Sequence, residues 1–555
     1  MQNGLFLFGL FSVALAARKC GQYEECCNVR ISVDMIPVIT TPLPILKECD
    51  QVEVPCEYFS ELLQNVAPQA TLNPFGNDGA LAAFDEQGTL VSFVRPDTGE
   101  SRVFPQFEGL KPGEDLAPKA MAAAIQFAND SSLFPKDDTE LVVLTPKTVF
   151  TSKSSSGGNS TDPEEILSFV RLERQVNGIP VDGPGTQATI AVDGNGCIQA
   201  FAHRYRPASL TDHYVCPYPP EKIVQLIIDD LAGTCDRDEV VIDQVVLTYY
   251  DSGNGSIRPA YRYQGSIPGN SSSTPHAHVL GSIPVGPDDG DTMGSLPTAD
   301  YPSNADGPYF RRYAKRYPGP EQATVGRYVP RNDSILWLES ATAFFNNLQL
   351  ATSFGSDLSF INEQYLEANS SMFVSDRNQF VNSVQIALNE LHGDWDTFST
   401  YKTDGDLVTL SEIAAAGGLG CGADGHLAYW ILHSCEVIPT QTDLPNSFDV
   451  WWGIFRGLRS VVGYRTDMWI DDDVTANFGL WLGLGAGVVP AWFLELAVTN
   501  WYGAHDQVYF DYNRGFMEPL GRPSSVSVCG HLDDTAFELE GLDHPNCLVE
   551  LWMEN

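Results

Sequence analysis

The chain has 555 residues, which is too long for one hydrophobic core, so we expect about two to four domains. Hydrophobic residues make up 43% and charged residues 19%, as in an ordinary folded protein. Acidic residues outnumber basic ones by 72 to 32, and the net charge is -40. Such a surface repels phosphate backbones, which excludes nucleic acid as an expected partner.

Residues 1–16 have the features of a secretory signal peptide. Leu5–Val13 is a short apolar run, and Ala14-Leu15-Ala16 is a small-x-small cleavage site. We therefore expect a secreted, extracellular protein without a membrane anchor, whose mature chain starts near Ala17. N-glycosylation agrees with secretion and is predicted at the sequons Asn129, Asn159, Asn254, Asn270, Asn332 and Asn369.

The chain contains 12 cysteines, and in a secreted protein these predict disulfide bonds. Residues 17–72 form a Cys-containing N-terminal segment with little periodicity. Two further pairs are close enough in sequence for local bridges, Cys216 with Cys235 and Cys529 with Cys547.

Residues 73–283 have the pattern of small α+β modules. Hairpins are predicted at the turns Glu86-Gln87-Gly88, Asn177-Gly178 and Asp193-Gly194. Helices are predicted for "APKAMAAAIQFAND" and for "PPEKIVQLIIDDLAG", which has Pro at its start and Gly at its end. The stretch "QVNGIPVDGPGTQATIAVDGNGCIQAF" with the following helix resembles the propeptide modules of secreted bacterial and fungal peptidases, which implies a chaperone or inhibitor segment.

Residues 284–330 are rich in Pro, Gly and Asp and are predicted to be a linker. Two dibasic pairs lie in it, Arg311-Arg312 and Lys315-Arg316. They fit processing sites for a secretory-pathway convertase, and equally a solvated basic patch that docks on an acidic surface.

Residues 331–555 predict an α/β domain, a mostly parallel sheet with helices on both faces. The runs "SILWLES", "VNSVQIALNEL", "LAYWILHSC" and "SVVGY" favour strands, and "FDVWWGIFRGLR" favours a helix. The uncharged run 478–494 contains Pro490 and lacks basic flanks, so we expect a buried helix or hairpin there.

Two of these apolar strands end in reactive residues, one in His392-Gly393 and the other in Cys435. Carboxyl ends of neighbouring parallel strands converge on one crevice, so the histidine and the cysteine can meet there. An imidazole can activate a thiol and later protonate a leaving amine. The backbone N–H groups of Gly393 and Cys435 could together form an oxyanion hole.

This arrangement resembles the caspase, gingipain and legumain superfamily of cysteine peptidases. The stretch from "FNNL" through "ELHGDW" and "LHSCEV" to "WYG" is also similar to an uncharacterised family of secreted bacterial and fungal proteins. The resemblance implies His392 as general base and acid, Cys435 as nucleophile and Gly393 as an oxyanion contributor. The sequence departs from better-known members because it has no Gln-Ala-Cys-x-Gly motif.

Each of these residues also has an ordinary structural interpretation. Cys435 could form a disulfide with Cys421, which the even cysteine count favours. His433 is a rival base or a hydrogen-bonded structural histidine. Asp394 and Asp396 could orient His392, bind a basic substrate side chain, or lie in an exposed turn.

The sequence therefore supports two functions. The first is a secreted cysteine peptidase-like zymogen that acts on a peptide or protein substrate through the Cys435–His392 dyad. The second is a non-catalytic secreted binding module with Cys435 in a disulfide. No metal or cofactor is expected, since the "HAH" pair His276 and His278 lacks a third ligand in sequence reach.

Overall fold

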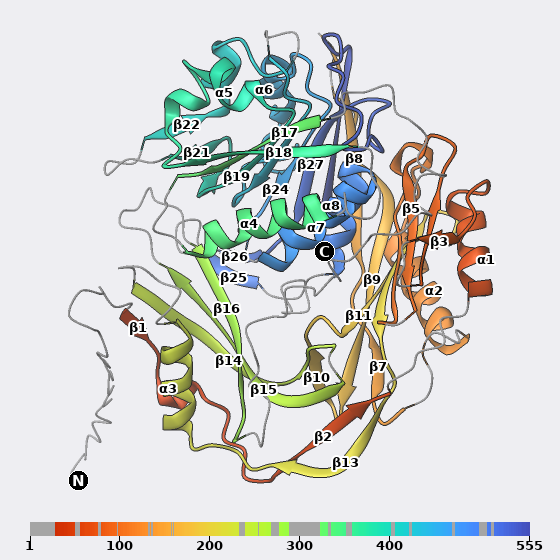
Figure 1. The fold of residues 1–555 in the computed structure, drawn as a ribbon, viewed down its shortest axis with the longest axis vertical. Helices are drawn as coiled ribbons and strands as arrows, with labels where there is room; N and C mark the ends of the chain where they lie inside the picture. The colour runs from red at the N-terminus through yellow and green to blue at the C-terminus, as the bar shows by residue number, and fades with distance from the viewer. Residues whose placement is uncertain are drawn as a thin grey trace, which may run out of the picture.

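The computed structural model describes residues 28–49, 56–231, 239–287 and 322–554, apart from gaps at 76–78, 97, 131–133, 135–136, 157, 159, 254, 268–276, 331–334, 351–357, 401–405, 421–424, 469–471, 499–507 and 512–515. The predicted signal peptide and both dibasic pairs lie outside these residues. Figure 1 shows an elongated molecule with the C-terminal α/β part at one end and most N-terminal strands beside and below it. Within the described ranges, no helix is long and apolar enough to span a membrane.

Parallel strands form the centre of the C-terminal part. Their spatial order is β18 (Ser359–Leu366), β17 (Gln322–Val329), β19 (Ile386–Glu390), β23 (Tyr429–His433) and β24 (Ser460–Tyr464). The antiparallel strands β27 (Pro523–Val528) and β28 (Cys547–Glu554) extend this sheet. The structure confirms the predicted mixed α/β class.

Helices cover both faces of the parallel strands. One face carries α4 (Ile335–Leu350), α7 (Asp472–Leu484) and α8 (Val488–Val498), and the other carries α5 (Leu410–Ala415) and α6 (Ser447–Ile454). Side chains alternate between the faces along a strand, so Ile386 and Leu388 join the first core and Ala387 joins the second. The apolar run 478–494 lies mostly in α7 and α8, and every residue of α8 is buried, which agrees with the expected buried helix.

Two expectations about the start of this part are wrong. Residues 322–329 belong to the predicted linker 284–330, yet they form β17, which pairs with β18 and β19 inside the sheet. The run "SILWLES" favours a strand by composition, but it begins α4. A short apolar run is compatible with both the strand repeat and the helical repeat. The helical spacing becomes visible only over a longer window, in the buried residues Trp337, Ala341, Phe344 and Leu348.

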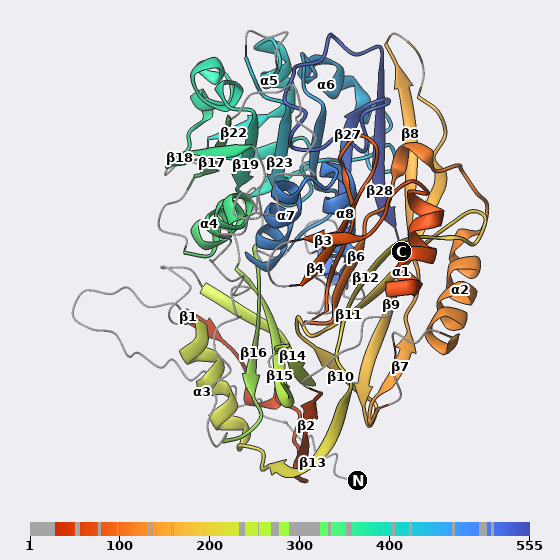
Figure 2. The same cartoon turned by 45° about the vertical axis from the view of Figure 1, so that its right-hand side comes forward.

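The predicted hairpins of the N-terminal region are present. They join β4 (Ala80–Phe84) to β5 (Leu90–Arg95), β9 (Glu164–Val176) to β10 (Ile179–Asp182), and β11 (Thr186–Asp193) to β12 (Ile198–Tyr205). The strands β3 (Asn73–Phe75), β6 (Glu100–Val103) and β7 (Glu140–Val143) extend these sheets. Helices α1 (Cys56–Val66) and α2 (Leu116–Asp130) pack on their outer face, as Figure 2 shows.

A second N-terminal module contains β13 (Ala208–Val215), β14 (Glu239–Asp251), β15 (Ser256–Ile267), β16 (Ala277–Pro284) and the predicted helix α3 (Pro220–Leu231). Strand β1 (Asn28–Arg30) pairs with β14, and β2 (Leu43–Glu48) pairs with β13 and β15. The expected separate segment 17–72 is therefore divided, because β1 and β2 belong to this module and α1 belongs to the first.

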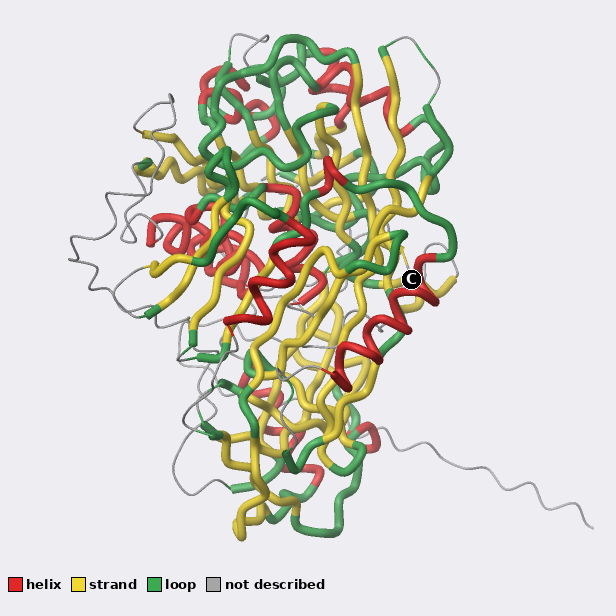
Figure 3. The backbone as a smooth tube through the Cα atoms, turned by 90° about the vertical axis from the view of Figure 1, so that its right-hand side faces the viewer, coloured by secondary structure: helices red, strands yellow, loops and turns green. Residues whose placement is uncertain are grey.

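The N-terminal and C-terminal parts share one continuous sheet. Strand β28 pairs antiparallel with β8 (Lys147–Ser155) from Cys547–Ser155 to Glu554–Thr148, and β8 pairs with β9. Figure 3 shows strands running through both parts of the molecule. The expected boundary between 73–283 and 331–555 thus does not separate two independent sheets.

A buried ion pair joins the same two parts. The guanidinium Nε of Arg102 on β6 lies 3.4 Å from Oε1 of Glu495 on α8, and the indole N–H of Trp481 donates to that oxygen at 2.8 Å. The Arg102 and Glu495 side chains are 1% and 0% exposed. Arg102 Nη2 also lies 3.6 Å from Glu100 Oε1, so this one cation compensates two buried carboxylates, of which Glu495 belongs to the other part of the molecule.

We predict that Arg102→Met destabilises the protein by about 3–5 kcal/mol, because it leaves the Glu495 carboxylate buried without its cation. The double variant Arg102→Met/Glu495→Met should recover part of this loss, because Glu100 still lacks its cation, and the exposed Lys119→Met should cost little. Denaturant unfolding of the purified chain measures the difference. A loss below about 1 kcal/mol in Arg102→Met would show that the pair does not hold the two parts together.

Candidate functional site

The connectivity of the parallel sheet marks the place where a site is expected. From β17 the chain passes through α4 to β18 on one side, and it then returns to β19 on the other side of β17. In open α/β sheets, ligands bind beyond the carboxyl ends of the strands at such a reversal. His392 follows the carboxyl end of β19 at this position, so the topology favours a site beside it.

The pairing of β19 with β23 brings the predicted residues to neighbouring strand ends. The two strands are parallel and in register, with Glu390 paired to His433. His392 and Cys435 each lie two residues beyond this last pair. A His–Cys pair at two strand ends requires adjacent strands, and β19 and β23 are adjacent.

Both side chains belong to the face covered by α4, α7 and α8. The His392 ring lies edge-on to Trp337 of α4, with ring centroids 4.6 Å apart. Cys435 belongs to the same buried core as Trp337 and Met468. The alternation along each strand continues past its end, which puts the imidazole and the thiol on one side of the sheet.

Gly393 makes the close approach between the two loops possible. It begins β20 (Gly393–Asp394), which pairs with β21 (Thr397–Ser399), itself paired with β22 (Leu407–Thr409). A Cβ atom at Gly393 would collide with the carbonyl oxygen of Cys435 and with the Ser434 hydroxyl. Only glycine fits there, so the position is constrained by packing as well as by any contribution to an oxyanion hole.

Both loops also carry a non-glycine residue in the left-handed region of backbone conformation. Trp395, three residues after His392, has φ 32°, and Glu436, directly after Cys435, has φ 49°. Such conformations cost energy for residues with a Cβ atom and often occur at functional sites. Each of the two loops therefore contains one residue in this conformation, at a different distance from the strand end.

The Cys435 thiol is enclosed. The residue is 3% exposed, its sulfur accepts a hydrogen bond from the Met468 N–H at 3.4 Å, and the thiol hydrogen-bonds to Asp467. Burial, followed by the negative charge of Asp467, raises the thiol pKa well above its usual value. The structure therefore holds Cys435 as a protonated thiol, and its expected disulfide partner Cys421 lies outside the described residues.

A buried Glu–His pair is formed by the last residues of β19 and β23. Glu390 Oε2 is 2.6 Å from His433 Nδ1, and the two side chains are 1% and 0% exposed. The sequence allows His433 to be a rival base or a hydrogen-bonded structural histidine, and this contact supports the structural interpretation. Sequence reasoning missed Glu390, although a carboxylate in the mainly apolar strand "IALNEL" indicates a buried partner.

Hydrogen bonds continue from this pair into the covering helices. The Ser340 hydroxyl of α4 donates to Glu390 Oε1 at 2.7 Å, and it lies 2.9 Å from the Thr475 hydroxyl of α7. His433 Nε2 is buried and has no hydrogen-bond partner among the described residues. The chain Thr475–Ser340–Glu390–His433 thus fixes two helices against the two strands that carry His392 and Cys435.

The other predicted site residues lie farther out. Asp394 is exposed, Asp396 is half-buried with its carbonyl accepting from Leu410 N–H, and His426 is exposed in the loop before β23. Asn129 is exposed near the end of α2, and Asn369 is half-buried. Outside the described residues lie Asn159, Asn254, Asn270, Asn332, Arg311, Arg312, Lys315, Arg316 and His276.

Cysteine positions agree in part with the expected local bridges. Cys529 and Cys547 lie at disulfide-bonding distance, and they join the end of β27 to β28. Cys216 is an exposed thiol, and Cys235 lies outside the described residues. In the described part of the chain, no group of three or more His, Cys, Asp or Glu side chains is arranged to hold a metal ion.

We predict that Asp467→Asn speeds alkylation of Cys435 several-fold at pH 7–8. The change removes a negative charge that raises the thiol pKa, so a larger fraction of the thiol is ionised at a given pH. Timed iodoacetamide labelling with peptide mass spectrometry measures the rate, and the exposed thiols of Cys49, Cys197 and Cys216 serve as internal references. An unchanged or slower rate at Cys435 would contradict this description of its surroundings.

We also predict that Glu390→Ala lowers the free energy of unfolding by about 3–5 kcal/mol, since it removes one member of a buried pair. The matched control is Glu363→Ala on β18, where the side chain is exposed. Chemical denaturation compares the two variants. Equal effects would show that the Glu390–His433 contact does not stabilise the strand ends.

Comparison with known proteins adds a family of unknown function. A family model described as "Domain of unknown function (DUF6345)" matches residues 338–509, which include β19, β23, His392 and Cys435. No curated protein matches the chain. One similar solved structure is the crystal structure of an uncharacterized protein from Eubacterium rectale ATCC 33656, with 13% identity, 44% of this chain and 84% of that chain covered, and a TM-score of 0.28. A similarity at that level supports no argument about fold or activity.

Proposed function

We propose that the C-terminal part, from β17 to β28, is a cysteine peptidase-like acyl-transfer domain in a closed state. Cys435 is the nucleophile, His392 the general base and acid, and Gly393 a contributor to the oxyanion hole. The observation that carries this proposal is the in-register pairing of β19 with β23, because His392 and Cys435 each follow their strand's last paired residue by two positions. The topological reversal at β17 and β19 supports the same location.

The reaction follows from the chemistry of the two side chains. His392 accepts the Cys435 proton, and the thiolate attacks the carbonyl carbon of a peptide substrate. The tetrahedral oxyanion is stabilised by backbone N–H groups, the C–N bond breaks, and the imidazolium donates its proton to the leaving amine. Water activated by His392 then hydrolyses the thioester, releasing the acid and restoring the thiol.

The buried thiol indicates that this state is latent. A protonated, enclosed Cys435 is a poor nucleophile, so activation must expose the sulfur or bring His392 into contact with it. We further propose that the N-terminal modules act as a propeptide of a secreted, glycosylated zymogen and that cleavage occurs after Lys315-Arg316. The pairing of β8 with β28 would keep the two cleaved pieces together as a two-chain protein.

A second candidate is a secreted binding module without catalysis. The enclosure of the Cys435 thiol by Met468 and Asp467 favours it, since an inert core cysteine is held in this way. Because Cys435 is a thiol here, this candidate does not include the Cys435 disulfide that the sequence left open.

We predict that, once the linker is cleaved, iodoacetamide at about pH 6 labels Cys435 in preference to the exposed Cys49, Cys197 and Cys216. His392→Ala should slow this labelling at least about tenfold, because the imidazole no longer activates the thiol. The measurement is peptide mapping by mass spectrometry, before and after limited trypsin treatment, with N-terminal sequencing to locate the cut.

Two controls separate the candidates. Cys435→Ala identifies the labelled peptide, and His426→Ala removes an exposed histidine that precedes β23 and should change nothing. If Cys435 in the cleaved protein labels no faster than the exposed thiols, and equally fast in His392→Ala, the binding module is the better account.

A further inference from the structure

Three strands end together where the two N-terminal modules meet. Strand β10 leaves the β9 hairpin and pairs in parallel with β14 through Val181–Tyr249 and Asp182–Tyr250, and β2 ends beside them at Glu48. A small apolar cluster of Leu46, Val176, Val181, Ala208, Tyr249 and Ile257 fills this contact. We call this contact, with the strand ends Glu48, Asp182 and Asp251, the β2–β10–β14 joint.

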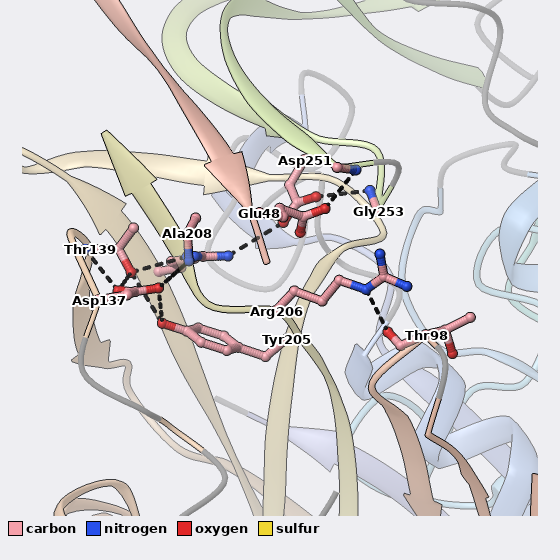
Figure 4. A network of polar contacts seen from close by, with 11 residues as sticks. Glu48, Thr98, Asp137, Thr139, Tyr205, Arg206, Ala208, Asp251 and Gly253 are labelled. Atoms are coloured by element: carbon pink, nitrogen blue, oxygen red, sulfur yellow. Dashed lines mark hydrogen bonds and ion pairs between the residues drawn. The ribbon is translucent and has the colours of Figure 1, made fainter. Parts of the chain in front are cut away.

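Two carboxyl groups face each other in the joint. Glu48 is 2% exposed and Asp251 is 0% exposed, and their carboxyl groups lie close enough to interact electrostatically (Figure 4). The Gly255 N–H donates to Glu48 Oε2, and the Gly253 N–H donates to Asp251 Oδ1, both at 2.8 Å. Two buried carboxylates this close repel each other, which favours a proton on one of them.

The nearby cations do not replace that proton. Arg174 of β9 donates to Asp137 Oδ2 at 2.7 Å and lies 3.5 Å from Asp251 Oδ2. Arg206 Nε donates to the carbonyl of Thr98 at 3.4 Å, on the side away from the pair (Figure 4). Arg204 acts on Asp251 at longer range and is half-buried. Arg174 is thus shared between Asp137 and Asp251, so this one cation faces three carboxyl groups and the pair stays short of positive charge.

The remaining charged and titratable groups at the joint are paired or neutral. Asp137 also accepts from the Tyr205 hydroxyl at 3.0 Å and from the Ala208 N–H at 2.9 Å. Asp182 forms an ion pair with Arg262 at 3.1 Å. Burial raises the pKa of Tyr249 to about 12, so this phenol stays neutral in the ordinary pH range.

The backbone closes the space around the pair. Gly183 has φ 112°, and a Cβ atom there or at Gly185 would collide with Asp251. The Gly185 N–H also donates to the Asp251 carbonyl at 3.1 Å. Asp251 is therefore held against β11 and cannot turn toward solvent while the joint is closed.

We propose that Glu48 and Asp251 share a proton and form a pH-sensitive latch that holds β2 against β14 at the β2–β10–β14 joint. The latch is closed at acidic pH, and it weakens as the pH rises toward mildly alkaline values, when both groups become charged. The site needs no other ligand, and the inference is independent of the proposed peptidase activity.

The sign of the effect follows from proton linkage. Burial, followed by the charge of Asp251, raises the pKa of Glu48 from 4.5 to about 8, and burial also raises the pKa of Asp251. The folded joint therefore binds more protons than the open chain. Its stability is greatest below about pH 4.5 and declines as the pH rises to about 8.

Hydrogen exchange of the full chain tests the latch. After correction for intrinsic rates, amide protection in β2 and in the last residues of β14 should fall by about tenfold or more between about pH 5.5 and 8.5, since one proton gives at most about tenfold per pH unit. Protection in β19 and β23, far from the joint, should change less. Unchanged wild-type protection at the joint would overturn the proposal without any variant.

Isosteric variants assign the effect to the pair. Glu48→Gln and Asp251→Asn each remove one titration, so either should flatten the dependence of joint protection on pH. Glu221→Gln, at an exposed glutamate in the first turn of α3, should retain the wild-type dependence. If folded Glu48→Gln or Asp251→Asn protein keeps the full wild-type dependence, another group controls it and the latch is wrong.

Discussion

The parallel register between β19 and β23 is the constraint on which the candidate site depends. Pairing Glu390 with His433 fixes which residues leave the sheet side by side. A slip of one residue would turn every side chain of one strand to the opposite face. The buried contact between the Glu390 carboxylate and the His433 imidazole makes such a slip costly, because it would leave both polar groups unpaired in an apolar core. The same pair that orders the core therefore also sets the strand ends from which the loops of His392 and Cys435 begin.

The shared sheet constrains the proposed propeptide role of the N-terminal modules. In a simple zymogen, cleavage lets an inhibitory segment diffuse away. Here β28, the last strand of the C-terminal part, is hydrogen-bonded along its length to β8, and Arg102 is buried against Glu495. A cut in the linker would leave these interactions intact. Activation would then depend on movement within one joined molecule, such as release of the Cys435 sulfur from Asp467 and Met468.

Local patterns in the sequence predicted much of this fold. Turn residues located the hairpins at Asn177-Gly178 and Asp193-Gly194, and apolar runs ending in His392 and Cys435 located two central strands. The incorrect or missing predictions concern contacts between residues that are far apart in the sequence. The run that begins α4 fits a strand when read alone, and β17 has its partners β18 and β19 only in the folded sheet. The Glu390–His433 contact and the β8–β28 pairing join distant parts of the chain, so no single segment reveals them.

The most direct test of the central claim uses a substrate-like electrophile. A mixture of peptidyl fluoromethyl ketones, incubated with the cleaved protein, reacts with a thiolate that is next to a base in a peptide-binding site. We expect peptide mapping to find the adduct on Cys435, and we expect His392→Ala to lose it while the exposed thiols remain unmodified in both. An adduct that is absent from Cys435, or that forms there equally well without His392, would contradict the dyad.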